Sequence, residues 1–190
     1  MKSNPQDQQK FRRLTRHEGF GHARELTFSC FKQRPFLRSE RSRQWVVEAI
    51  RRSRDRHGFR LLAWVVMPEH VHLLVLPRRS DDEVGPILKT IKQSVTRSSD
   101  LFLRSTGKPK PESIADRAPS GAIVHRLWQR GAGYDRKPYT NDAICSSIEY
   151  IHANPVRRGL CKSPLEWEWS GARALAGCAD SLLPLDRIRL

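Results

Sequence analysis

The 190-residue chain predicts an α+β fold in which helices pack on a central antiparallel sheet. Residues 61–77, LLAWVVMPEHVHLLVLP, contain two nearly all-apolar runs on either side of a Met-Pro-Glu turn, a pattern typical of two neighbouring buried strands. Residues 40–57 and 82–103 instead repeat their apolar side chains at helical spacing, one stretch before this pair of strands and one after it. Strands and helices thus alternate along one chain.

The helices have boundary signals as well as apolar stripes. Gly58 follows the first helix, where glycine commonly takes the left-handed conformation that ends a helix. Thr140 or Asn141 is expected to cap the third helix, and Pro155 follows its expected last residue. The expected elements are helices over 40–57, 82–103 and 141–154 and strands over 24–31, 59–66, 71–76 and 125–129, the last continued by 134–137.

In chain order these elements match the split β-α-β arrangement of ferredoxin-like and RRM-like folds, with a central antiparallel sheet and flanking helices. We expect this domain over 23–160, between a basic N-terminal arm (1–22) and a tail (161–190) that packs back on the domain. Residues 105–121 are rich in Ser, Pro, Gly and Lys, which predicts a mobile loop. A fold does not determine a function, so the side chains have to indicate the chemistry.

The charge of the chain indicates the class of partner. The sequence has 35 Lys and Arg against 20 Asp and Glu, and residues 1–60 alone hold 16 basic and 6 acidic side chains. Such an excess favours a nucleic acid over a merely solvated basic surface. No apolar stretch is long enough for a membrane span, the N-terminus lacks a signal-peptide pattern, and the four cysteines form no C-x-x-C pair. We therefore expect a cytoplasmic protein that binds nucleic acid.

Two pairs of residues are candidates for chemistry. His70 and His72 alternate with apolar residues, so both imidazoles project from the same face of the expected strand. They are either half of a metal site or two satisfied core histidines. Tyr150 and Asn154 lie four residues apart, hence on one helix face. Tyrosine can act as a covalent nucleophile and an amide oxygen suits a hard cation, but an ordinary half-buried tyrosine and a helix cap would give the same pattern.

Three segments together carry a resemblance to a known family. They are MPEHVHLLV (67–75), WQRGAGYDR (128–136) and EYIHANPVRRGL (149–160). In this order they resemble the HUH single-tyrosine transposases, and more closely the REP-associated tyrosine transposases of bacteria, over residues 24–169. The resemblance implies that His70, His72 and Asn154 hold a divalent metal, Mg²⁺ or Mn²⁺, and that Tyr150 is the nucleophile. Tyr134 is the rival nucleophile.

The same resemblance implies a reaction and a substrate. Tyr150 would cleave and rejoin single-stranded DNA, next to palindromic hairpin repeats, through a covalent 5′-phosphotyrosine, in a monomer or a homodimer. Arginines suit phosphate binding, and the candidates are Arg12, Arg13, Arg16, Arg157 and Arg158. Glu69 adjoins the histidines either as a supporting residue or as part of the turn. The alternatives are a non-catalytic nucleic-acid-binding module on the same fold, a metal-dependent nuclease that uses water, and a relaxase or replication initiator, although the latter are generally larger.

Overall fold

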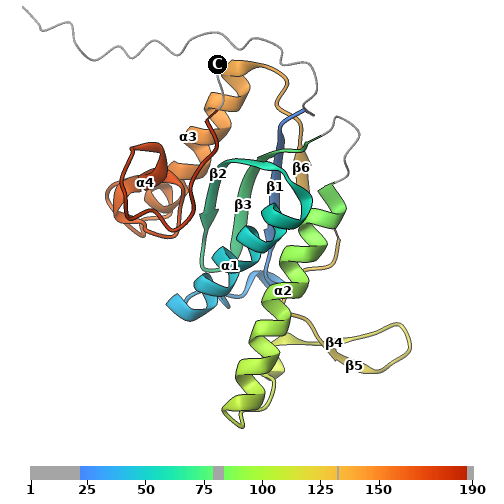
Figure 1. Ribbon diagram of the computed structural model, residues 1–190. Helices are drawn as coiled ribbons and strands as arrows, with labels where there is room; N and C mark the ends of the chain where they lie inside the picture. Colours follow the sequence, from blue (N-terminus) through green and yellow to red (C-terminus); the bar gives the residue numbers. More distant parts are fainter. Residues whose placement is uncertain (1–21, 79–83, 132, 188–190) are drawn as a thin grey trace, which may run out of the picture.

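The core of the protein is a four-stranded antiparallel sheet, seen in a computed structural model that describes residues 22–78, 84–131 and 133–187 (Figure 1). The strands lie in the order β2-β3-β1-β6. Their bounds are Arg24–Ser29 for β1, Arg60–Val66 for β2, His70–Leu76 for β3 and Tyr134–Arg136 for β6. The expected α+β class, with a central antiparallel sheet and the strand order of the split β-α-β arrangement, is confirmed.

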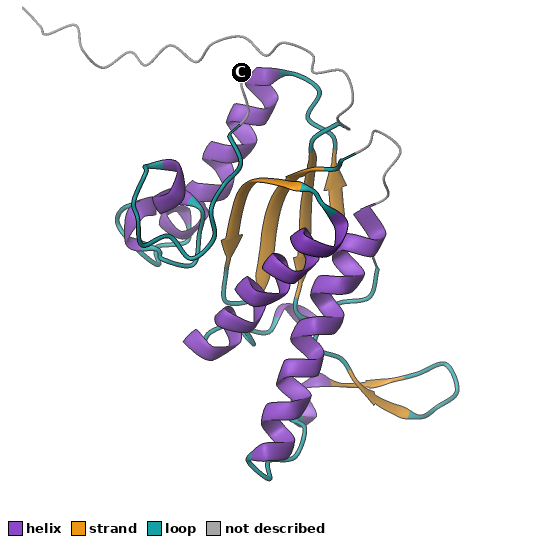
Figure 2. Cartoon of the chain, viewed as in Figure 1, coloured by secondary structure: helices purple, strands orange, loops and turns teal. Residues whose placement is uncertain are grey.

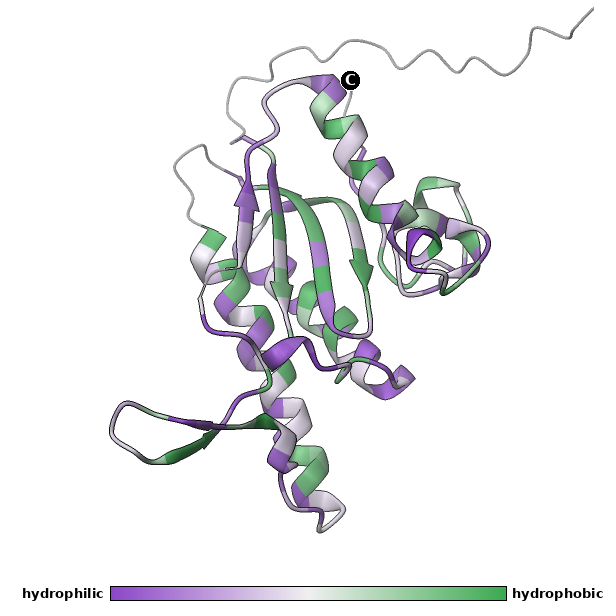
Figure 3. Ribbon diagram, turned by 180° about the vertical axis from the view of Figure 1, so that it is seen from behind, coloured by the Kyte–Doolittle hydropathy of each residue, from purple (hydrophilic) through white to green (hydrophobic). Residues whose placement is uncertain are grey.

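Two helices cover one face of the sheet and a third covers part of the other. Helices α1 (Glu40–His57) and α2 (Val84–Ser105) pack on the face that carries Leu26, Phe28 and Leu73. Helix α3 (Asn141–Arg157) packs on the opposite face, mainly against β2 and β3. The view from behind leaves the strands visible beside α3, because this helix covers only one side of that face (Figure 3).

The helix boundaries follow the sequence signals closely. Ser39 caps α1 by accepting a hydrogen bond from the Ser42 backbone N–H, and Gly58 ends the helix with a left-handed φ of 65°. The Thr140 side chain accepts a hydrogen bond from the Ala143 N–H at the start of α3. Helix α3 ends at Arg157, three residues later than expected. Pro155 thus lies in its last turn rather than after its end. A proline there removes a single helical hydrogen bond.

The region before the last sheet strand differs from the expectation. Residues 125–129 form no strand of the four-stranded sheet: residue 125 ends β5 (Ile123–His125), which pairs with β4 (Ala115–Arg117) in a separate hairpin that projects beside α2 (Figure 2). The expected loop 105–121 thus contains a 3-10 turn (Glu112–Ile114) and β4. Trp128 bridges to Cys30 at one position only, and its ring packs edge-on against Phe28 at 5.2 Å between centroids. Burial of this indole, rather than strand pairing, fixes the segment.

The C-terminal residues lie along the outer edge of β2. The backbone N–H of Val66 donates to the Trp169 carbonyl at 2.9 Å, and the N–H of Asp186 donates to the Leu61 carbonyl at 2.8 Å. Leu183 is buried in the core between α1 and this edge. The segment therefore satisfies backbone groups that an edge strand would otherwise leave open to another chain. Its two short helical turns are η3 (Pro164–Glu166) and α4 (Ala172–Leu175).

The sequence also predicted a basic N-terminal arm and no membrane span. The basic arm 1–22 lies outside the described residues, apart from residue 22. Within the described ranges, no helix is both long and apolar enough to cross a membrane.

Candidate active site

Strand β3 directs two imidazoles toward the face that α3 partly covers. The Nε2 atoms of His70 and His72 lie 3.0 Å apart, and the ring planes are nearly perpendicular, at 85°. His72 is 7% exposed and His70 is partly buried. The two-residue spacing in a strand thus produces a convergent pair of ring nitrogens beneath the helix.

Each imidazole has a partner on its other nitrogen. Glu69 Oε1 lies 3.1 Å from His70 Nδ1, and Thr27 Oγ1 lies 2.7 Å from His72 Nδ1. A carboxylate only accepts hydrogen bonds, so a neutral His70 donates Nδ1–H to Glu69 and keeps a lone pair on Nε2. When a neutral His72 donates Nδ1–H to Thr27, its Nε2 likewise keeps a lone pair. Both rings are then held in the tautomer that binds metals through Nε2.

Burial keeps both imidazoles neutral. It lowers the pKa of His72 from 6.5 to about 3, and repulsion from His70, when that ring is protonated, acts in the same direction. Burial also lowers the pKa of His70, while the Glu69 carboxylate opposes this shift. Neutral imidazole is the form that coordinates a cation.

Helix α3 adds the second pair of candidates to the same place. The Asn154 side chain is 6% exposed, and its Nδ2 lies 3.2 Å from His72 Nε2. The Tyr150 ring, one turn earlier, stands perpendicular to the His72 ring at 5.8 Å between centroids. Tyr150 remains 41% exposed, so its phenol is open to solvent while its neighbours in the site are buried. The helix therefore brings an amide and an accessible hydroxyl to the histidine pair.

The two arginines that follow this pair also lie at the site. The Arg157 guanidinium lies over the Tyr150 ring, 4.7 Å from its centroid. Arg158 Nη2 lies 3.0 Å from Glu69 Oε1, and this carboxylate is the one that orients His70. One arginine thus places positive charge beside the candidate nucleophile, and the other completes a chain of contacts from solvent to the buried imidazoles.

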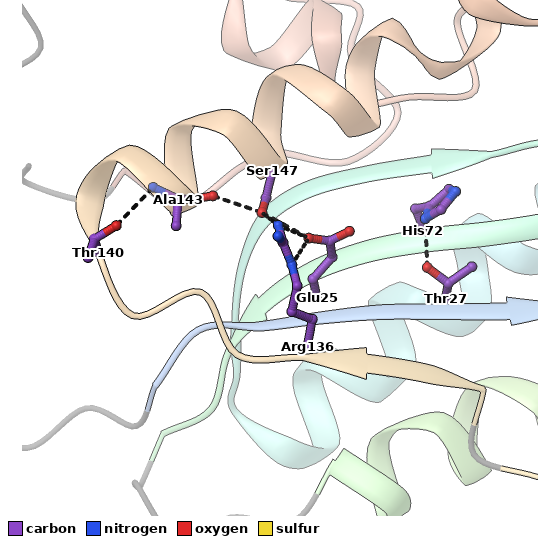
Figure 4. A network of polar contacts seen from close by, with 7 residues as sticks. All are labelled: Glu25, Thr27, His72, Arg136, Thr140, Ala143 and Ser147. Carbon is purple, nitrogen blue, oxygen red and sulfur yellow. Dashed lines mark hydrogen bonds and ion pairs between the residues drawn. The ribbon is translucent and has the colours of Figure 1, made fainter.

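A buried polar network fixes α3 to the sheet (Figure 4). Glu25 on β1 is 5% exposed, and its Oε2 accepts hydrogen bonds from Arg136 Nη2 at 2.7 Å and from Ser147 Oγ at 2.9 Å. Arg136 Nη2 also lies 2.7 Å from Ser147 Oγ, so strands β1 and β6 and helix α3 meet at one carboxylate. Ser147 lies one turn before Tyr150. The network therefore holds the candidate nucleophile in register with β3.

The side chains at this site fit a divalent cation. Two lone pairs 3.0 Å apart repel unless a proton or a cation lies between them. An octahedral ion with ligands about 2.1 Å away separates adjacent ligands by roughly 3.0 Å. A half-turn of the Asn154 amide brings its Oδ1 to the place of Nδ2, and an amide oxygen suits such an ion. Among the described residues no three His, Cys, Asp or Glu side chains form a metal-binding group, and the Asn154 amide is the further candidate ligand beside the two histidines.

The structure brings together most of the site residues that the sequence suggested. His70, His72, Tyr150 and Asn154 share one site, and Arg157 and Arg158 border it. The arm arginines Arg12, Arg13 and Arg16 lie outside the described residues.

Sequence reasoning missed the orienting hydroxyl of Thr27 and the network around Glu25. Nothing within β1 marks these residues as part of a site, because their partners lie between 45 and 122 positions away in the chain. Only the pairing of β1 with β3, which sets Thr27 opposite His72, reveals the first of them.

The sequence of the chain is similar to two proteins that are named as REP-associated tyrosine transposases. No family model matches the chain. A REP-associated tyrosine transposase of Escherichia coli (strain K12) is 28% identical over 137 residues, which cover 72% of this chain and 67% of the relative. A Haemophilus influenzae protein named as a REP-associated tyrosine transposase is 23% identical over 122 residues, 64% of each chain. The chain thus spans about two thirds of the length of these relatives.

The fold has a counterpart among solved structures. The structure of a REP-associated tyrosine transposase bound to a REP hairpin matches 91% of this chain and 88% of its own, with a TM-score of 0.64 and 21% sequence identity. This match extends the likeness from the aligned sequence segments to nearly the whole architecture. The two named relatives bear out the resemblance that the three sequence segments carry, and the solved structure shares the fold. The chain is thus similar in sequence and in fold to the REP-associated tyrosine transposases.

Proposed function

We propose that the protein is a metal-dependent transposase that cleaves and rejoins single-stranded DNA through a covalent link to Tyr150. The observation that carries this proposal is the convergence of an accessible phenol, two neutral imidazoles and a buried amide at one site. A protein that only bound nucleic acid would not need two oriented, buried histidines under an exposed tyrosine. The transposase names of the relatives support the same reading.

The proposed reaction exchanges one phosphoester for another. The Tyr150 hydroxyl oxygen attacks the phosphorus of a DNA phosphodiester and loses its proton to solvent. The bond from phosphorus to the 3′ oxygen breaks, and this oxygen takes up a proton. The products are a 5′-phosphotyrosine and a free 3′-hydroxyl. A 3′-hydroxyl of DNA can reverse the step, so rejoining needs no external energy source.

The surrounding residues have distinct roles in this scheme. His70, His72 and Asn154 would hold the divalent cation, Mg²⁺ or Mn²⁺. Such a cation, when bound, neutralises charge that develops on the phosphate oxygens. Thr27 and Glu69 hold the two imidazoles in the ligand tautomer. Arg157 adds fixed positive charge beside the phenol, where the attacked phosphate has to lie.

The proposed substrate is single-stranded DNA beside a palindromic hairpin. The net charge of +15 suits a polyanion, and the solved relative is bound to a REP hairpin. Arg157 and Arg158 border the site and are candidates for backbone contacts. The proposed reaction is compatible with a monomer or a homodimer.

A covalent adduct is the direct test of this function. Labelled single-stranded oligonucleotides from the DNA that flanks the gene are incubated with the protein and Mg²⁺ or Mn²⁺ and separated on a denaturing gel. We expect a protein-linked band that disappears with a chelator and in Tyr150→Phe, because the phenol oxygen forms the new bond. Tyr139→Phe is the matched control, since Tyr139 is exposed and belongs to none of the contacts described at the site.

Other outcomes would identify the alternatives. Cleavage without a linked band would indicate a nuclease that uses water. Binding without cleavage in either metal would indicate a nucleic-acid-binding module. A linked band that persists in Tyr150→Phe would rule out Tyr150 as the nucleophile.

A further inference from the structure

A hollow lies close to the candidate active site, at the edge of the sheet where the chain enters β6. Its volume is about 150 Å³. Its lining includes the polar side chains of Ser29 and Gln129 and the cations of Lys92 and Arg130. Tyr134 also belongs to the lining and is 58% exposed. Nothing in the proposed strand-transfer chemistry uses this hollow.

The register of the sheet places Tyr134 on the same face as the histidines. Thr27 on β1 pairs with His72 on one side and with Tyr134 on the other. Directly opposed residues in antiparallel strands point to the same face, and the Thr27–His72 hydrogen bond shows which face this is. Two strand spacings separate Tyr134 from His72, roughly 10 Å. Helix α3 packs mainly on β2 and β3, which leaves this side of the face open.

Backbone contacts with β1 hold two sides of the hollow. The Gln129 backbone N–H donates to the Ser29 carbonyl at 2.9 Å, and Tyr134 pairs with Thr27. Gly133 has φ +81°, and a Cβ there would overlap the Thr27 carbonyl oxygen. Only glycine allows this approach. The hollow is therefore preformed.

Lys92, on helix α2, contacts the same edge of the hollow from the helix layer. Its Nζ donates to the Gly131 carbonyl at 2.9 Å, and the ammonium lies 5.5 Å from the centre of the Phe28 ring. A carbonyl takes only one of the three ammonium protons, and none of the carboxylates in the described ranges pairs with Lys92. The remaining protons can donate to a phosphate oxygen.

The groups that line the hollow suit one nucleotide of a single strand. An exposed aromatic ring offers a stacking surface for any base, and the amide, hydroxyl and cationic groups in the lining can meet the polar edge or the phosphate of a nucleotide. Tyr134 gains little from burial where it is, since more than half of it is exposed and its hydroxyl has no hydrogen bond to a described residue. An exposed aromatic in such surroundings indicates a binding role more than a packing role.

We propose that the Tyr134 hollow binds a nucleobase of the same single strand that Tyr150 attacks, by stacking on the Tyr134 ring. This inference rests on the proposed function and specifies its substrate contact. The separation of roughly 10 Å between Tyr134 and His72 places the stacked base close along the strand to the attacked phosphate. Tyr134 is then a positioning residue, and its predicted role as the rival nucleophile does not arise.

The test measures base stacking without cleavage. All variants carry Tyr150→Phe, and the oligonucleotide from the gene-flanking DNA carries the fluorescent base 2-aminopurine at successive positions. We expect quenching at one position near the cleavage site. In Tyr134→Ala we expect that quenching to be lost and the affinity to fall by about 5- to 150-fold, as for one stacked base. Tyr134→Phe keeps the ring and should restore both, while Tyr139→Ala is the matched control on another exposed tyrosine.

A second measurement does not depend on the folding of a variant. Removing the base at the quenched position, to leave an abasic site, should weaken binding to the Tyr150→Phe protein to the same degree. Unchanged quenching and affinity in Tyr134→Ala, or an abasic oligonucleotide that binds as tightly as the intact one, would overturn the inference. Neither result would change whether the unmodified protein forms the covalent adduct. The adduct assay therefore tests the proposed function separately from base binding in the Tyr134 hollow.

Discussion

At the scale of single residues, the site depends on groups that touch no substrate. Thr27 and Glu69 contact the Nδ1 atoms of the two histidines and leave the Nε2 atoms facing each other. Partners of this kind set the orientation and tautomer of metal-binding histidines, and their loss commonly lowers metal affinity. Glu69, whose role the sequence left open, is a contact of both His70 and Arg158.

Removing the Thr27 hydroxyl should weaken the metal site without changing its shape. Thr27→Val keeps the branched side chain but cannot accept the His72 Nδ1–H, so we expect Mn²⁺ to bind about 10- to 100-fold more weakly. Titration calorimetry measures this affinity. Thr27→Ser, which keeps a hydroxyl, is the control and should lose much less. Equal Mn²⁺ affinity in Thr27→Val and the unmodified protein would show that Thr27 does not orient a ligand.

At the scale of elements, helix α3 contains the proposed nucleophile, and one buried carboxylate holds this helix against the sheet. Glu25 accepts from Arg136 and from Ser147, so the outermost sheet strand and the helix are tied together through β1 (Figure 4). A buried carboxylate is costly unless its oxygens are paired, and this one has an arginine and a hydroxyl. The position of Tyr150 over β3 is thus linked to a contact one helical turn away.

Ser147→Ala should reduce stability through this network. The substitution removes one hydrogen bond to the buried carboxylate, which we expect to lower the free energy of unfolding by about 1 kcal/mol. Urea unfolding followed by circular dichroism gives the value. Ser146→Ala is the matched control, because Ser146 is the exposed neighbour on the same turn, and surface changes stay within about 0.5 kcal/mol. If Ser147→Ala and Ser146→Ala have the same free energy of unfolding, the network does not stabilise the packing of α3 on the sheet.

At the scale of the whole molecule, the positive charge is distributed over more than the active face. A groove of about 610 Å³ runs along α2 and contains Lys92, Arg97, Arg104 and the edge of Trp128. Lys92 also lines the Tyr134 hollow, so the groove and the hollow adjoin at this residue. A nucleic acid can therefore meet cations on the helix layer as well as beside Tyr150, and the groove is a candidate for backbone contacts.

Binding of single-stranded DNA should weaken steeply with salt, because cations released from the phosphates contribute to affinity. If the α2 groove contacts the backbone, Arg104→Gln should reduce the slope of log affinity against log salt by about 1. Fluorescence anisotropy at several salt concentrations measures the slope. Arg56→Gln on α1 is the matched control, since Arg56 is exposed but does not line the groove.

The two variants separate a specific contact from general charge. A similar change in slope for Arg104→Gln and Arg56→Gln would mean that only net charge matters. An affinity that stays flat with salt in the unmodified protein would contradict an electrostatic mode of binding altogether.

Much of the fold followed from local sequence patterns. The β2–β3 pair was predictable because two apolar runs flank a proline turn, and α1 because its apolar stripe ends at Gly58. The fourth strand, β6, was expected only as the continuation over 134–137 of a strand that begins at 125, because its three exposed residues have no apolar pattern of their own. Its pairing with β1 depends on contacts between Glu25 and Arg136, 111 positions apart. A segment with strand character, 125–129, was instead drawn toward the core by the burial of Trp128.

Each half of the candidate site follows from local residue spacing. Strand periodicity put His70 and His72 on one face, and helix periodicity put Tyr150 and Asn154 on another, because each pair lies within one element. Only the tertiary structure brought these halves together, supplied Thr27 and Glu25, and opened a hollow beside Tyr134. The physical reason is that spacing fixes directions within an element, whereas the meeting of elements depends on packing and strand pairing between residues far apart in the chain.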